Sequence, residues 1–190
     1  MRILCVVLAL TMMACFTPMP AMAFHGPSDV RCASCHTPHH AASGTVPLWN
    51  GAATKSTFIL YTSNTFDATD TITQPDGSAK LCLSCHDGVV TGTGHGLGTD
   101  MTLNHPISFV YNDALATKDG HLELPTSKTV VSGGTIANDL LDINNKLQCV
   151  SCHEIHNTPS KMYPAYLRGV QYNTEPGGDT QTFCRQCHKK

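Results

Sequence analysis

Hydrophobic residues are concentrated at the start of this chain. Residues 3–16 are almost wholly apolar and follow a short basic start. Two prolines come after this run, and residues 21–23 (AMA) have the small-x-small pattern of a cleavage site. This order of features is typical of a secretory signal peptide. We therefore expect residues 1–23 to be removed and residues 24–190 to form the exported protein.

The same leader has a second interpretation as a lipoprotein signal, in which Cys15 would carry the lipid. A methionine occupies the position where such signals usually have leucine, so we favour cleavage after Ala23. The apolar run is shorter than the about 20 residues that a membrane-spanning helix needs. No later segment is comparably apolar, so the sequence predicts no transmembrane span.

Beyond the leader, the pattern of hydrophobic and polar positions is weak and predicts little regular structure. Residues 121–131 (HLELPTSKTVV) favour a short strand or one arm of a hairpin. Residues 137–147 (ANDLLDINNKL) favour a short helix, and turn signals occur at 75–77, 132–134 and 175–178. Large apolar side chains are few, so something other than side chains should fill the interior.

The charge of the chain is nearly balanced, with 12 Lys and Arg against 14 Asp and Glu. This balance argues against nucleic acid as a partner. Only 14% of the residues are charged, yet the chain has 11 histidines. Metal ligation is one explanation for such an excess of histidine.

Eight of the ten cysteines lie in four C-x-x-C-H motifs. This motif is the attachment signature of c-type haem, and we expect each copy to open or end a helical turn or a short helix. The two thiols add to the two vinyl groups of one haem, and the histidine is then held where it can bind the iron. The sequence therefore predicts four covalently attached haems. The cysteines are Cys32, Cys35, Cys82, Cys85, Cys149, Cys152, Cys184 and Cys187, and the proximal histidines are His36, His86, His153 and His188.

Zinc sites and disulfides are the alternatives for paired cysteines. Zinc would leave the four adjacent histidines unexplained. Disulfides are common in exported proteins but would not require a two-residue spacing. The predicted signal peptide favours haem, because c-type haem is attached after export.

Each haem iron has a second axial position, and seven further histidines are available to fill four such positions. His39 and His156 each follow a proximal histidine by three residues. A ligand so close in sequence cannot easily reach the far side of its own haem, so we expect each to bind the iron of a neighbouring haem. The alternative is that both face solvent on a short turn.

Two other histidines are favoured as distal ligands. His105 precedes Pro106, which restricts the backbone of His105 and so fixes the direction of its imidazole. His25 lies beside the expected mature N-terminus, which a metal bond would anchor. His121 is held in reserve. Weaker candidates for an axial position are His40, His95, Met101 and Met162.

Several segments together resemble one family. They look like the extracellular multihaem cytochromes that polymerise into conductive filaments, the cytochrome nanowires, whose closest members carry four haems. The resemblance covers nearly all of residues 24–190. It rests on residues 32–39 (CASCHTPH), 47–50 (PLWN), 81–88 (LCLSCHDG), 104–106 (NHP) and 149–157 (CVSCHEIHN).

The resemblance implies a multihaem cytochrome c fold: mostly coil, with short helices and room for one short hairpin, wrapped around a stack of four bis-histidine haems. It also implies that a histidine of one protomer ligates a haem of its neighbour, and the matching residue is His39. The third motif departs from the family pattern, because Glu154-Ile155 stands where Asp-Pro is more usual.

The function implied is electron transfer without substrate chemistry, because an iron with two protein ligands has no open position. The expected setting is a homopolymer outside the cell or at its surface, with other redox proteins or extracellular acceptors as partners. The alternative is a soluble tetrahaem shuttle in the periplasm.

A multihaem reductase, or its electron-transfer subunit, is less favoured. One variant of such enzymes replaces the proximal histidine of a motif with lysine. All four motifs here end in histidine, so that enzyme signature is absent.

Overall fold

The structure is a computed structural model that describes residues 32–41, 48–70, 72–89, 96–156, 167–168 and 183–189. Within these ranges, no helix is both long enough and apolar enough to cross a membrane. Several expectations lie outside the described residues and stay predictions. These are the leader at 1–23 with Cys15, the candidate ligands His25, His95 and Met162, and the turn at 175–178.

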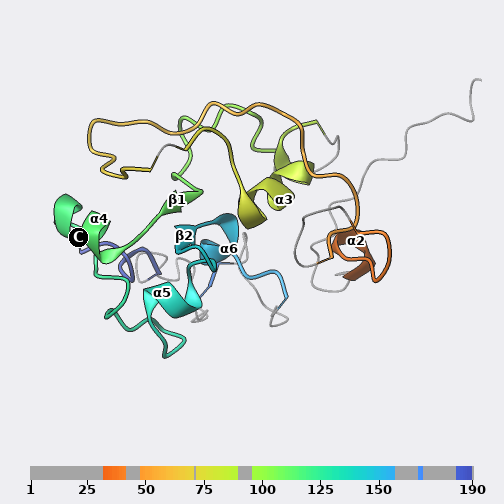
Figure 1. Ribbon diagram of the computed structural model, residues 1–190. Coiled ribbons are helices and arrows are strands. Elements are labelled where there is room, and N and C mark those ends of the chain that lie inside the picture. Colours follow the sequence, from red (N-terminus) through yellow and green to blue (C-terminus); the bar gives the residue numbers. More distant parts are fainter. Residues whose placement is uncertain are drawn as a thin grey trace, which may run out of the picture.

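Most of the described chain is irregular coil that connects short helices (Figure 1). Two short strands pair in antiparallel fashion, with Phe109 opposite Leu147 and Val110 opposite Lys146. A long connection separates the two strands in sequence. The elements are α2 (Cys32–Cys35), α3 (Gly77–His86), β1 (Phe109–Val110), α4 (Asp113–Asp119), α5 (Ile136–Asp139), β2 (Lys146–Leu147) and α6 (Cys149–Cys152).

All four C-x-x-C-H motifs lie on helical turns, as expected from the sequence. α2 and α6 each consist of the first four residues of one motif, from cysteine to cysteine. α3 ends with the second motif. The fourth motif begins in a helical pair, Phe183 and Cys184, and continues as a turn through Cys187. Because residues three apart share one face of a helix, both thiols of a motif lie on the same side of the chain.

The helix predicted over 137–147 is wrong for most of its length. α5 ends at Asp139, and Lys146 and Leu147 form β2 instead. The Asp142 carboxylate accepts hydrogen bonds from the backbone N–H groups of Asn144 and Lys146, at 2.8 and 2.9 Å. Asn145 adopts a φ of 56°. Asp and Asn favour such turns over helix because their side chains bond to the nearby backbone.

No strand is assigned within 121–131, but the end of this segment forms one arm of a small hairpin. The Val130 N–H donates to the Gly134 carbonyl at 2.9 Å, and the Ile136 N–H donates to the Lys128 carbonyl at 3.1 Å. Residues 121–131 also form a turn at 125–127 and contribute only isolated bridges, from Leu122 to His188 and from Thr129 to Thr135. The turn signal at 132–134 is confirmed. The signal at 75–77 instead begins a helix, since Asp76 is the N-cap of α3.

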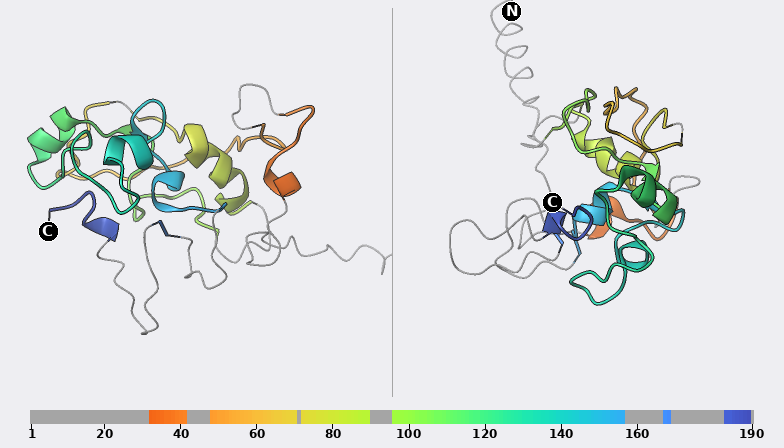
Figure 2. Two further views of the ribbon diagram at one scale, coloured as in Figure 1. Left: turned by 90° about the horizontal axis from the view of Figure 1, so that it is seen from below. Right: turned by 90° about the vertical axis from the view of Figure 1, so that its left-hand side faces the viewer.

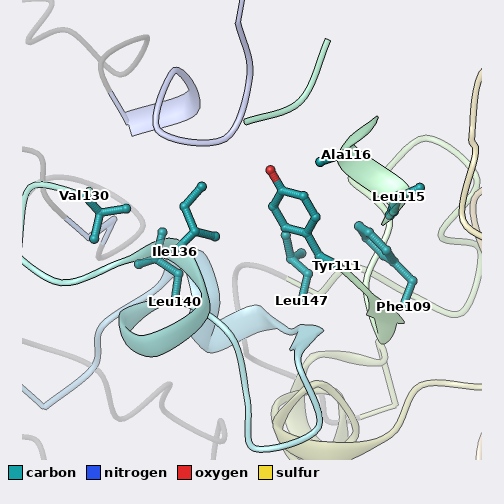
Figure 3. Close-up of a cluster of buried hydrophobic side chains, with 8 residues drawn as sticks. All are labelled: Phe109, Tyr111, Leu115, Ala116, Val130, Ile136, Leu140 and Leu147. Atoms are coloured by element: carbon teal, nitrogen blue, oxygen red, sulfur yellow. The ribbon is translucent and has the colours of Figure 1, made fainter. Parts of the chain in front are cut away.

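A small hydrophobic core lies between the strand pair, α4 and α5 (Figure 3). Tyr111 is at its centre, 2% exposed, and its hydroxyl donates to the carbonyl of Glu123 at 2.7 Å. Burial raises the pKa of this hydroxyl. Cys187 of the fourth motif packs against the same cluster. The buried members are Phe109, Tyr111, Leu115, Ala116, Val130, Ile136, Leu140 and Leu147.

The described elements are spread along one long axis. α2 lies at one end, α4 lies at the other, and α3 and α6 lie between them (Figures 1 and 2). α3 packs against α6, which brings the second and third motifs together.

We expect Tyr111→Phe to lower the free energy of unfolding of the protein by about 1 kcal/mol, because the part-buried Glu123 carbonyl loses this hydrogen bond. Guanidinium unfolding followed by far-ultraviolet circular dichroism would measure the change. Tyr61→Phe is the matched control at a partly exposed tyrosine, and it should leave the value nearly unchanged. An equal loss in both variants would contradict the assigned role of the Tyr111 hydroxyl.

Candidate functional site

The four motifs follow one another along the long axis in their sequence order. In Figure 2 (left), α2, α3, α6 and the helical turn at Phe183 succeed each other from one end of the molecule towards the other. All eight motif cysteines are free thiols in the structure. The described part of the chain therefore presents a row of thiol pairs.

The cysteine sulfurs of neighbouring motifs lie close enough to affect one another. Burial raises the pKa of Cys35, and the sulfurs of Cys85 and Cys82 in the second motif raise it further. Burial likewise raises the pKa of Cys152 in the third motif to about 11, with a contribution from Cys184 in the fourth. Neighbouring motifs are thus in electrostatic contact at both ends of the row.

The closest of these junctions joins the second and third motifs. The side chains of Cys82 and Cys149 interact directly. This interaction lowers the pKa of Cys82 and raises the pKa of Cys149. The attachment points of two different motifs are therefore in direct contact.

A cavity of about 800 Å³ adjoins the fourth motif, and its wall contains both cysteines and the histidine of that motif together with two candidate distal histidines. Cofactor pockets usually measure about 300 to 1,000 Å³. The donors in its wall are Cys184, Cys187, His188, His105 and the reserve candidate His121. The rest of the wall is mostly apolar and includes Phe66, Leu103, Phe109, Tyr111, Leu115, Leu122, Leu140, Leu141, Leu147 and Phe183.

His105 and His188 face each other in this cavity. Their ring centroids are 6.2 Å apart, and the ring planes are inclined by 77°. Nδ1 of His105 lies 2.9 Å from the carbonyl oxygen of Pro106. A carbonyl only accepts, so Nδ1 carries the proton and Nε2 keeps its lone pair for a metal. Burial lowers the pKa of His188, and His105 lowers it further, which favours the neutral imidazole that binds metals.

A second pair of imidazoles joins the first and third motifs. The ring centroids of His36 and His156 are 6.0 Å apart, with the planes inclined by 19°. Nδ1 of His156 lies 3.4 Å from the carboxylate of Glu154, which also pairs with Arg168 at 3.0 Å. A carboxylate on one ring nitrogen orients the other nitrogen towards a metal. The Glu154 that departs from the family pattern thus has a defined place beside a candidate ligand.

Trp49 and Asn50 hold the first motif in place. Trp49 forms an antiparallel bridge with His36, and the backbone N–H of Asn50 donates to the Cys35 carbonyl at 2.7 Å. The Asn50 side chain also donates to the Ala33 carbonyl at 2.6 Å. These contacts fix the turn that carries His36.

The second motif is tied to an upstream segment through Asp87, the residue after His86. Asp87 is 6% exposed and accepts hydrogen bonds from Thr54 at 2.7 Å and from Ser56 at 3.1 Å. Burial alone would raise the pKa of Asp87, but these bonds and one from the Val89 N–H outweigh it and lower the pKa.

The remaining candidates lie apart from these two imidazole pairs. His39 and His40 are exposed near α2. Met101 is 4% exposed and packs with Phe58 and Leu83, so it serves the hydrophobic interior. Across the described ranges, no cluster of three or more His, Cys, Asp or Glu side chains assembles as a metal site.

The pairing of His36 with His156 could not be read from the sequence, because no local spacing relates them. Gln148, directly before the third motif, was also missed. Its side chain joins α3 and α6 by hydrogen bonds, and nothing in the sequence pattern distinguishes it from an exposed glutamine.

No protein-family model matches this chain, and no curated protein is significantly similar to it. The interpretation of the site therefore depends on the residues of this chain and their geometry.

Proposed function

We propose that this protein attaches four haems through its C-x-x-C-H motifs and transfers electrons along them. The observation that carries the proposal is the spacing of the two imidazole pairs. A metal about 2 Å from each of two imidazole nitrogens places the ring centroids about 6 Å apart. The measured separations are 6.0 and 6.2 Å.

The fourth motif fits a haem best. Cys184 and Cys187 would form the thioethers, and His188 and His105 would supply imidazole nitrogens to the iron. The apolar cavity wall suits a porphyrin, since it would replace the large side chains that the sequence lacks. At the first motif, Cys32, Cys35 and His36 would hold the haem, with His156 as the second axial ligand.

Electron transfer is favoured over catalysis because these pairs would saturate the iron. When bound, haem supplies an iron centre that gains and loses one electron, at a potential set by its ligands and surroundings. Two imidazoles on one iron leave no position for a substrate. The residues of this chain then act by holding the haems, excluding water and orienting the imidazoles.

The proposed assembly is a homopolymer, with a soluble shuttle as the alternative. His39 supports the polymer because it is exposed near α2, at one end of the row of motifs. His36 beside it already faces His156 within the same chain. His39 is thus available to a haem of a neighbouring protomer, as the resemblance to the filament-forming family implies.

The first experiment is to count the haems. Intact-mass measurement of the mature protein should show four covalently added haems, and its absorption spectrum should be that of a low-spin c-type cytochrome. Colourless protein, or protein that contains zinc instead, would overturn the proposal.

We expect His105→Ala to open one iron in the fourth site. The reduced variant should bind carbon monoxide at one haem of the four, while the unaltered protein binds none; absorption difference spectra measure this. His121→Ala is the matched control in the same cavity and should bind none. If only the His121 variant bound carbon monoxide, His121 would be the ligand instead of His105.

We expect His39→Ala to abolish filaments while leaving all four haems attached, because it removes only the ligand offered to a neighbour. Electron microscopy and intact mass would test the two parts. His40→Ala, at the adjacent exposed histidine, should leave filaments intact. Filaments that persist unchanged in the His39 variant would show that His39 is not the intersubunit ligand.

A further inference from the structure

Gln148 joins the beginnings of the two helices that carry the second and third motifs. It is fully buried and is the N-cap residue of α6, directly before Cys149. Its backbone N–H donates to the Ser151 hydroxyl at 2.9 Å, so a residue inside the third motif fixes the start of its own helix.

The Gln148 amide uses its full hydrogen-bonding capacity in this position. Oε1 accepts from the N–H of Ala79 at 3.4 Å and from the Ser108 hydroxyl at 3.2 Å. Nε2 donates to the carboxylates of Asp76 at 2.9 Å and Asp142 at 3.0 Å. Two donors and two acceptor positions are all that a glutamine amide has. The side chain therefore has one defined orientation.

The same amide caps α3 from outside that helix. Asp76 is the N-cap residue of α3, but its side chain makes no capping bond. The Ala79 N–H is in the first turn, where backbone donors have no partner within the helix, and Gln148 supplies one. One side chain thus fixes the start of α3 while its own backbone begins α6.

The approach of Gln148 to α3 is close. A Cβ on Gly77 would lie 2.8 Å from Nε2 of Gln148, and Gly77 has a φ of 49°, which glycine adopts most readily. Lys146 pairs with Asp76 and compensates part of the negative charge of the two carboxylates.

These contacts determine how the second and third motifs meet. α3 packs against α6, and the side chain of Cys149, next to Gln148, interacts with that of Cys82 on α3. We propose that Gln148 is a positioning residue that sets the separation of the second and third haems, and with it their electronic coupling. This inference rests on the proposed function, since it concerns haems attached to these cysteines.

The test compares Gln148→Ala with the unaltered full-length protein after haem attachment. Intact mass first establishes that each carries four haems. Circular dichroism in the Soret region then measures the couplet produced by adjacent porphyrins, which weakens as they separate or rotate. We expect Gln148→Ala to reduce the couplet amplitude while the total absorption stays the same.

Gln74→Ala is the matched control. Gln74 lies shortly before α3 in the sequence, and its side chain also bonds to backbone groups. It accepts from the Phe58 N–H at 2.8 Å and donates to the Phe58 carbonyl at 3.0 Å. None of these bonds reaches α6, so the couplet should stay unchanged. A normal couplet in Gln148→Ala, or an equal loss in both variants, would overturn the inference. Failure of the unaltered protein to carry four haems would instead overturn the proposed function.

If Gln148→Ala does not mature, Ser108→Ala provides the decisive comparison. This change removes one bond to Oε1 of Gln148 and the acceptor for the Asp76 N–H, which lies 3.1 Å away. We expect a smaller loss of couplet amplitude in the same direction. An unchanged couplet in a four-haem Ser108 variant would overturn the inference.

Discussion

Three of the motifs close a single helical turn with a hydrogen bond from the histidine N–H back to the first cysteine's carbonyl. The bonds measure 2.7 Å at His36, 2.9 Å at His153 and 2.9 Å at His188. Each bond is local and holds the backbone of one motif as a single turn. The rest of the chain has only to bring these turns together, which explains how so polar and irregular a polypeptide can have an ordered arrangement.

Side-chain packing plays a limited part in that arrangement. One hydrophobic cluster lies beside α4 and α5, and a smaller one joins Phe58, Leu83 and Met101. Hydrogen bonds of buried polar side chains connect other parts of the chain. Gln148 bonds to Asp76 at the start of α3, and Asp87, next to the second motif, bonds to Thr54. Such networks have a strong orientational requirement, because each buried polar group needs its partner. They therefore suit a protein that must hold rigid groups in fixed relation.

The sequence allowed the motif turns and the scarcity of regular structure to be predicted, because both follow from local spacing and composition. It failed at 137–147, where the turn around Asp142 and Asn145 outweighed a weak helical pattern. At 121–131 it predicted a strand or hairpin arm, and only a small hairpin around Thr129 and Thr135 formed. The pairing between residues 109–110 and 146–147 is long-range and was not predicted. Which imidazoles face each other, and the role of Gln148, depend on tertiary contacts that leave no local signal.

The Glu154 carboxylate interacts with two side chains, each of which contacts a different motif. It contacts His156, which faces the first motif, and Arg168, whose Nε and backbone N–H donate to the carbonyls of Val150 and Cys152 in the third motif. One negative charge thus acts on groups at both the first and the third motif. Under the proposed function, a change of charge at the haem of either motif would alter the electrostatic field at the other, so these two haems would not titrate independently.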